Sequence, residues 1–411
     1  MLQNVSFTPS RRALEFGIYR DGDNNLDSIQ ESTLSQALQT SARDARIEFT
    51  VEDTTKLRSD GDSISSGPLH TEQYTIAGGD VAHVRVGEAH EMSDEANLAR
   101  FVATTLDNAR ANGAKQTWID LVDHGGGDGG GLQTRSGKCM SMPDIAKAIA
   151  DGVALHAAAH PEDAGRSVDG VVANQCLMDT MGFADALSGA GVKYLAASPE
   201  TMLAPGVPSN VAHAIAAHEN DPSAMAHSVV GDVMRTKYDA GDFGGFGPAA
   251  AFDVLDVSPE KIRSAEASIK RLNDDVAASA RNREVRGAVR EDARAIGGMV
   301  RFPGGAQMPW HADRPAIAFY DTLADDGRLD PGLRRDAEAA SAAVRGLVLA
   351  HRESGGFAPF GGADYSDAVG PTVHLPTSRA QVDPWASAGV TETHNAFYAK
   401  VDEAAMTGVL A

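Results

Sequence analysis

Two residues that could act as a nucleophile and a base each follow an apolar stretch of the chain. Cys176 comes after Val171–Asn174, and His124 comes after Thr117–Val122, 52 positions earlier. Short apolar runs of this kind indicate buried parallel strands, and the residues after them lie at the carboxyl edge of the sheet, where ligands bind in open α/β folds. A thiol near backbone N–H groups at that edge can have its pKa lowered from about 8.5 toward neutrality. The pair is therefore predicted to form a catalytic dyad, whereas a cysteine considered alone is more often a small buried hydrophobe.

Glycines directly follow His124. A backbone N–H group can approach a reacting carbonyl closely where no Cβ intervenes, so the N–H groups of Gly125 and Cys176 are predicted to form an oxyanion hole. The segment Gly125–Gly131 also matches the pattern Gly-x-Gly-x-x-Gly. A dinucleotide fingerprint needs a helix that begins there, but Gln133–Lys138 indicates a continuing loop, so nucleotide binding is not predicted.

Five segments in this order form a larger pattern: Tyr19–Asp27 with its Gly-Asp-Asn-Asn-Leu element, Asp123–Gly127, Cys176–Met178, Tyr194–Glu200 and Thr372–Pro376. Together they resemble the clostripain-like cysteine peptidases, which have the caspase-type fold. The resemblance implies an α/β class, with a caspase-like α/β/α sandwich around a mostly parallel sheet in residues 1–257. A mainly helical C-terminal part, residues 258–411, would pack on this core. The implied activity is that of a cysteine endopeptidase acting on a peptide or protein substrate.

The family usually carries an Asp two residues before the nucleophile, where it helps to hold a basic substrate side chain. This chain has Asn174 at that position. The resemblance therefore implies cleavage after Arg or Lys with relaxed strictness, and Asp179 or Glu200 are candidates to supply the missing charge. Asn174 also leaves open a catalytically idle relative that acts as a peptide-binding or regulatory module.

Members of the family commonly cut themselves in the loop between the His and Cys strands, which gives two chains that stay associated. The corresponding loop here contains Arg135 and Lys138, and a second candidate cleavage site is Arg166. Polar, glycine-flanked loops are accessible to proteolysis. Ordinary uncut surface loops are the alternative.

The Cys–His chemistry requires no cofactor, and no metal site is predicted. The acidic spacing in Asp21–Asp27 is similar to a calcium loop, but Leu26 replaces the required glycine and Ser32 the final glutamate. Calcium therefore stays an open alternative to helix capping. His156 and His160 have the i, i+4 spacing of zinc ligands, with Glu162 nearby, but no third ligand is clear, and an exposed helix end is predicted instead.

Composition limits the classes of function. The chain has 411 residues, 42% of them hydrophobic, and a net charge of −21. This charge argues against nucleic-acid binding and would attract basic substrates. No apolar run is long enough to span a membrane, and the start lacks the apolar core of a signal peptide, so a cytoplasmic location is the default, with export by another route left open. Two cysteines cannot build a disulfide framework.

Hydrophobic periodicity also predicts the elements that would position these residues. Strands are predicted over 13–20, 46–51, 115–122, 171–174, 192–198, 249–257 and 316–320, and helices over 93–112, 143–153, 180–188, 333–351 and 395–406 and from Ser258 onward.

Overall fold

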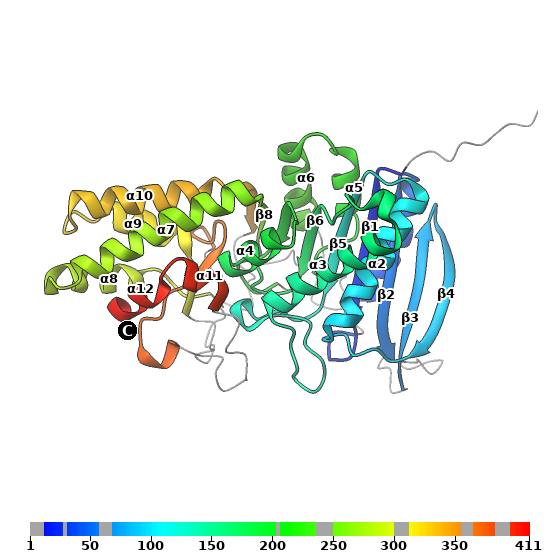
Figure 1. Ribbon diagram of the computed structural model, residues 1–411, viewed down its shortest axis with the longest axis horizontal. Coiled ribbons are helices and arrows are strands. Elements are labelled where there is room, and N and C mark those ends of the chain that lie inside the picture. Colours follow the sequence, from blue (N-terminus) through cyan, green and yellow to red (C-terminus); the bar gives the residue numbers. More distant parts are fainter. Residues whose placement is uncertain are drawn as a thin grey trace, which may run out of the picture.

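The computed structural model describes residues 12–27, 31–56, 68–202, 206–235, 250–299, 312–354, 365–382 and 395–411. Within these ranges, nine strands form one sheet in the spatial order β10-β8-β7-β6-β5-β1-β2-β3-β4 (Figure 1). The strands are β1 (Leu14–Asp21), β2 (Ile47–Lys56), β3 (Leu69–Ala77), β4 (Asp80–Glu88), β5 (Gln116–Val122), β6 (Gly170–Asn174), β7 (Tyr194–Ala197), β8 (Ala250–Asp256) and β10 (Val348–Ser354). A separate antiparallel pair joins β9 (Asp313–Pro315) to β11 (Thr372–His374).

Seven of the nine described strands of the large sheet point in the same direction. The central strands β2, β1, β5, β6 and β7 are parallel neighbours, whereas β3 and β8 run the opposite way. Parallel strands in the middle of a sheet are covered on both faces, and all eight residues of β1 are buried. The prediction of a mostly parallel sheet is confirmed, and the sheet gains antiparallel pairings toward both edges.

Helices cover both faces of the sheet, which confirms the predicted α/β/α sandwich. Alternate residues of each central strand point to opposite faces. Ile119 and Leu121 of β5 join one hydrophobic cluster with α2, α3 and α4, while Trp118 and Val122 join a second with α1, α5 and α6. The helices are α1 (Glu31–Arg43), α2 (Glu95–Asn112), α3 (Met142–Ala159), α4 (Met181–Gly189), α5 (Val211–Ala217) and α6 (Pro222–Arg235).

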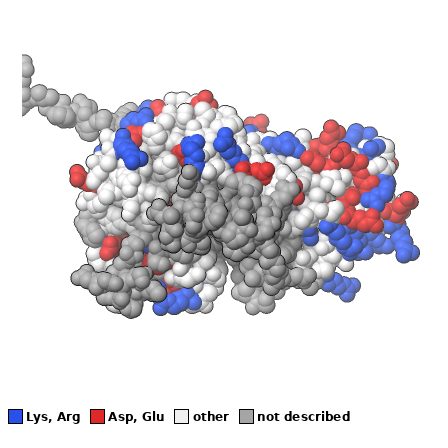
Figure 2. Space-filling view, turned by 180° about the vertical axis from the view of Figure 1, so that it is seen from behind, with Lys and Arg blue, Asp and Glu red and all other residues white. Residues whose placement is uncertain are grey.

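The remaining helices lie together at one end of the molecule (Figure 1). Their buried residues continue the cluster that covers the α2–α4 face of the sheet. They are α7 (Pro259–Ser279), α8 (Arg283–Ala295), α9 (Ala316–Asp325), α10 (Pro331–Arg345), α11 (Asn395–Lys400) and α12 (Glu403–Leu410). Acidic and basic side chains lie side by side over this end (Figure 2). Arg328, for example, forms ion pairs with Glu291 and Asp326. The surface charge in this view is therefore mixed.

Two element predictions in this half of the chain are wrong. Residues 316–320 begin helix α9 and are not a strand, because an apolar run of five residues fits a buried helix as well as a strand. The helix predicted over 333–351 ends at Arg345, and β10 follows and pairs antiparallel with β8. The central sheet therefore takes strands from both sides of the predicted boundary at residue 257.

None of the helices in the described ranges combines the length and the apolar character needed to cross a membrane.

Gly170, the first residue of β6, lies between two stacked aromatic rings on neighbouring strands. The register aligns Trp118, Gly170 and Tyr194 across β5, β6 and β7, and the two rings are 5.8 Å apart with an interplanar angle of 5°. A Cβ at Gly170 would lie 2.5 Å from Trp118 Cε3.

We expect Gly170→Ala to lower the free energy of unfolding by about 1–3 kcal/mol, the usual cost of overpacking a tight core. Urea denaturation measures this change. Gly165→Ala is the matched control, because a Cβ there meets no atom within 4 Å and the residue is exposed. Equal stability of the two variants would contradict the prediction.

Candidate active site

His124 and Cys176 lie just beyond the carboxyl ends of two neighbouring strands. β5 pairs with β6 in parallel, and the register places Val122 opposite Asn174. His124 is two positions beyond Val122, and Cys176 is two positions beyond Asn174. β1 pairs with the other side of β5, so the segment that follows Asp21 reaches the same edge. The topology therefore brings the segments that follow β1, β5 and β6 to the same edge of the sheet.

The turns that carry His124 and Cys176 pack backbone against backbone. A Cβ at Gly125 would collide with the carbonyl oxygen of Cys176 and would lie 2.9 Å from both Gln175 Cβ and Met178 Cγ. The Gln175 side chain also donates to the His124 carbonyl at 3.2 Å. Neither the Gly125 nor the Cys176 N–H group donates to a backbone carbonyl of any described residue.

The His124 ring is oriented by Asn25. Its Nε2 donates to Asn25 Oδ1 at 2.8 Å, because an amide oxygen can only accept. In the neutral ring this bond leaves the lone pair on Nδ1, the nitrogen that can take up a proton. Partial burial lowers the pKa of His124 from its ordinary value, so the ring is neutral at pH 7.

The neighbouring Asn24 ties the same segment to the His124 turn. Its Nδ2 donates to Asp123 Oδ1 at 2.5 Å and to the Gln133 carbonyl at 2.9 Å. Sequence reasoning noted Asn24 and Asn25 only as part of a motif and assigned them no role. The available signal was their position directly after a strand that ends at the same edge as β5.

In the segment Asp21–Asp27, whose spacing is similar to a calcium loop, the Asp27 carboxylate already accepts hydrogen bonds from an arginine and a threonine. Asp27 Oδ1 accepts from Arg20 Nη2 at 3.0 Å and from Thr55 Oγ1 at 2.8 Å. Asp21 Oδ1 accepts from the Asp23 N–H at 2.8 Å. Calcium binding here stays the alternative to helix capping, and an ion would have to compete with these contacts.

Cys176 sits in a tight turn directly after β6. The next residue, Leu177, has a φ of +65°, a left-handed conformation that costs a non-glycine residue about 1–2 kcal/mol. The Leu177 N–H bond to the Glu200 carbonyl at 3.1 Å helps to hold this turn. Cys176 Sγ accepts from the Met202 N–H at 3.3 Å.

The expectation that backbone N–H groups lower the thiol pKa is wrong for this site. Burial raises the pKa of Cys176, and the negative charges of Glu200 and Asp123 raise it further, which outweighs the opposite effect of the Met202 N–H. At neutral pH the resting pair is therefore a thiol and a neutral imidazole.

Asn174 is the last residue of β6, two positions before Cys176, and is only 4% exposed. Its Nδ2 donates to the Val207 carbonyl at 3.0 Å, and its Oδ1 accepts from the Val207 N–H at 2.7 Å. Asp120 lies beside it, fully buried, and burial raises its pKa well above the ordinary value, an effect that Asn174 partly offsets. Both ends of the Asn174 amide thus hold the backbone of the loop at Val207.

Asp179 and Glu200, the two candidate charges, are both fully buried but have different surroundings. Asp179 lies beside Asp253, and burial raises the pKa of Asp253 to about 8 and that of Asp179 well above its ordinary value. At least one of these two carboxyl groups is therefore protonated at pH 7. Glu200 Oε2 accepts from the Thr201 N–H at 3.1 Å, and its charge raises the pKa of Cys176. Of the two carboxylates, Glu200 is the one whose charge acts on Cys176.

The three candidate cleavage residues differ in accessibility. Arg135 and Lys138 are exposed in a turn in which Thr134 N–H bonds the Lys138 carbonyl at 3.0 Å. Arg166 is half-buried, and its guanidinium is held by hydrogen bonds to Asp163 at 2.6 Å and to the Ala114 carbonyl at 2.9 Å. The loop with Arg135 and Lys138 is thus the more accessible one.

A buried polar cluster contacts the glycine-rich loop Gly125–Gly131 at Asp128, and the sequence did not predict it. Tyr398 Oη of α11 donates to Asp128 Oδ2 at 2.7 Å, in the loop that follows His124. Asp313 and His374, from β9 and β11, offer donor atoms within 4.8 Å of Asp128. Burial raises the pKa of Asp313 to about 7. Distant segments of the C-terminal half therefore brace this loop.

Solved structures of C11 cysteine proteases share this fold. One is an inactive zymogen C11 protease from Parabacteroides distasonis, with a TM-score of 0.61 and 15% identity over 96% of this chain and 99% of that one. Another is a secreted C11 cysteine protease from Bacteroides thetaiotaomicron in complex with an irreversible peptide inhibitor, with a TM-score of 0.63 and 11% identity over 95% and 99% of the chains. No protein-family model matches the sequence, and no curated protein matches it.

At these identities the likeness establishes the fold. The chain has the caspase-like architecture of the C11, or clostripain-like, cysteine proteases along nearly its whole length.

The raised pKa of Cys176 predicts how the thiol reacts with iodoacetamide. In a Cys139→Ala background, which leaves one thiol, we expect the alkylation rate to rise with pH and to reach its midpoint above about 8.5, the ordinary cysteine pKa. Mass spectrometry measures the rate, and the same protein unfolded in guanidinium provides the reference profile. A midpoint at or below neutrality would show a stable thiolate and contradict the prediction.

Proposed function

We propose that this protein is a cysteine endopeptidase in which Cys176 is the nucleophile and His124 the general base. The observation that carries the proposal is the β5–β6 register, which brings both residues and the Gly125 backbone to one edge of the sheet. The fold adds support, because a protease with this fold has been solved with a bound peptide inhibitor. A peptide or protein is thus the proposed substrate.

The chemistry follows from the groups at the site. His124 Nδ1 accepts the proton of the Cys176 thiol, and the sulfur attacks the substrate carbonyl. The N–H groups of Gly125 and Cys176 stabilise the oxyanion. His124 then donates its proton to the leaving amine, and water hydrolyses the thioester. Asn25 Oδ1 accepts from Nε2–H throughout and so stabilises the imidazolium.

We further propose a preference for Arg or Lys before the scissile bond, with Glu200 as the source of negative charge. Asn174 carries no charge, and its amide is bonded to Val207. The charge of Glu200 already influences Cys176, so it would also act on a cation bound beside the nucleophile. The overall net charge of −21 favours the approach of basic substrates.

A catalytically idle peptide-binding module is the competing function. The raised thiol pKa of Cys176 favours this alternative, because it lowers the resting thiolate fraction. Labelling by a cysteine-reactive peptide probe distinguishes the two, since only a peptidase should transfer the probe to Cys176 at a rate that depends on His124.

Cys176→Ala should abolish hydrolysis of a diverse peptide library, because it removes the nucleophile. His124→Ala should lower kcat by about 10²–10⁴, the usual contribution of general acid–base catalysis. Cys139→Ala is the matched control and should retain full activity, since Cys139 lies outside the paired turns. Activity that survives in Cys176→Ala would assign the nucleophile elsewhere.

Glu200→Gln should reduce kcat/KM for substrates with Arg or Lys before the scissile bond at least tenfold relative to matched uncharged substrates. It should also lower the pKa of Cys176, because a nearby negative charge is lost. Library profiling and the alkylation profile measure the two effects. This variant is a cleaner test than Asn174→Asp, which would place a second carboxyl group beside buried Asp120 and remove the donor to Val207. If wild-type protein instead prefers uncharged residues before the scissile bond, the proposed specificity for Arg and Lys is wrong, while the proposed catalytic residues are unaffected.

We also propose that the enzyme cuts itself after Arg135 or Lys138 and that the two chains stay associated. Intact-mass analysis after long incubation, with and without calcium, should show two fragments for wild-type protein and one full-length mass for Cys176→Ala. Combined Arg135→Gln and Lys138→Gln substitutions should prevent the cut, whereas Arg166→Gln should not. A single full-length mass for active wild-type protein would rule out self-processing.

A further inference from the structure

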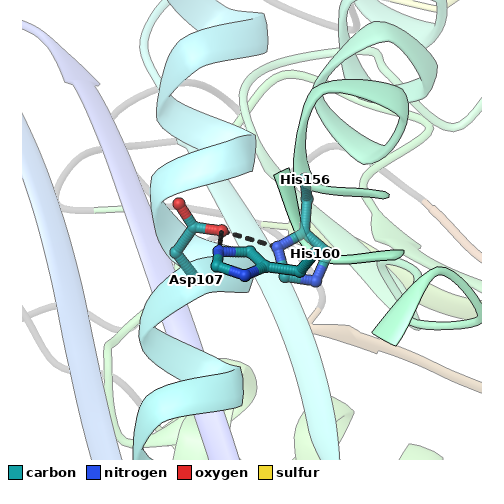
Figure 3. Close-up of side chains that lie close together, drawn as sticks. All are labelled: Asp107, His156 and His160. Carbon is teal, nitrogen blue, oxygen red and sulfur yellow. Dashed lines mark hydrogen bonds and ion pairs between the residues drawn. The ribbon is translucent and has the colours of Figure 1, made fainter. Parts of the chain in front are cut away.

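Two histidines and one aspartate converge between α2 and α3 (Figure 3). His156 lies on α3, His160 caps the C-terminal end of the same helix one turn later, and Asp107 comes from the adjacent helix α2. Asp107 Oδ1 lies 2.6 Å from His156 Nδ1 and 3.3 Å from His160 Nε2. One donor atom from each residue thus lies within 4.8 Å of the others. Asp107 supplies the third donor atom, which the sequence did not reveal.

The second ring nitrogen of each histidine faces another carboxylate. His156 Nε2 lies 3.4 Å from Asp163 Oδ2, and His160 Nδ1 lies 3.8 Å from Glu162 Oε1. Histidines that bind metals usually direct their other nitrogen to a carboxylate or carbonyl, which fixes the ring and the tautomer. These two contacts are ion-pair distances and not hydrogen bonds, but each carboxylate lies near the ring nitrogen that the outer partner of a metal-binding histidine usually contacts.

The two outer carboxylates are themselves held in place by arginines. Arg166 donates to Asp163 at 2.6 Å, and Arg110 donates to Glu162 at 2.6 Å. Each arginine also neutralises its carboxylate. Asp107 contacts only the two imidazoles in this cluster and no arginine. Its negative charge is therefore the one that would balance a divalent cation.

Burial gives the cluster one protected side and one open side. The His156 side chain is fully buried, whereas 27% of His160 and 45% of Asp107 is exposed. A cation held by these three residues would keep contact with solvent, and a water molecule could complete the coordination.

We propose that Asp107, His156 and His160 bind one Zn²⁺ ion, with water as the fourth ligand. Two imidazole nitrogens and one carboxylate suit zinc, at ligand distances of about 2.0–2.2 Å, whereas calcium and magnesium prefer oxygen ligands. His156 binds through Nδ1 and His160 through Nε2, the atoms that now share Asp107 Oδ1. The ion replaces the hydrogen that lies between each imidazole nitrogen and Asp107 Oδ1. The two helices separate slightly to make room for it.

The zinc site lies at the far end of α3 from the proposed catalytic edge. α3 begins at Met142, close to the Gly131–Met140 bridge of the glycine-rich loop, and His156 is 14 residues further along. At 1.5 Å per residue, this is about 21 Å along the helix axis. The ion therefore clamps α2 to α3 and stabilises the turn 161–163, and it takes no part in hydrolysis.

Zinc binding is measured in full-length protein that carries Cys139→Ala and Cys176→Ala, so that no thiol competes for the ion and the result does not depend on the catalytic assignment. Competition with a chromophoric chelator and metal analysis after gel filtration should give one zinc per chain. Added zinc should raise the thermal unfolding temperature, and a chelator should reverse the increase.

His160→Ala should weaken zinc binding at least tenfold and remove the zinc-dependent increase in the unfolding temperature. This variant should fold, since His160 is partly exposed at the helix end. His227→Ala is the matched control, because His227 is an exposed histidine on α6 outside the cluster. One zinc per chain that persists unchanged in His160→Ala, or no zinc on the parent protein, would overturn the proposal.

Discussion

β5 and β6 approach each other so closely beyond their carboxyl ends that only glycine fits at position 125. The carbonyl of Cys176 occupies the space that a Cβ would need, and Gln175 bridges to the His124 carbonyl. This contact holds the turns that carry His124 and Cys176 against each other. At the start of β6 the same two strands are also closely packed, because the Trp118 ring takes the place of a side chain at Gly170.

Buried acidic groups support the site from several directions. Asp120 lies below Asn174, Asp179 lies beside Asp253, and Asp128 lies near Asp313. Burial raises the pKa of these groups where a shift is resolved, with Asp253 at about 8 and Asp313 at about 7. A protonated carboxyl group can donate as well as accept, so such groups can join loops without an unpaired buried charge. Protonation of at least one of Asp179 and Asp253 accordingly reduces the negative charge buried around the proposed site.

The C-terminal half contributes more than an attached helical layer. β10 extends the central sheet, the Thr372 N–H bonds the Asp179 carbonyl at 2.9 Å, and Tyr398 reaches Asp128 in the glycine-rich loop. These contacts come from sequence positions about 190–270 residues away from the loops they support. Stability of the proposed catalytic edge therefore depends on both halves of the chain, whereas the proposed zinc site depends only on α2, α3 and the turn after α3.

The sequence by itself determined the α/β class, the two strands that end at His124 and Cys176, and the need for glycine between them. These features are local, because a buried parallel strand is a continuous apolar run and polar residues mark its end. Tertiary structure alone decided that Asn25 orients His124, that burial raises the thiol pKa, and that Asp107 meets His156 and His160. Each of these depends on contacts between segments that are far apart in the chain, and hydrophobic periodicity carries no information about which polar side chains will meet there.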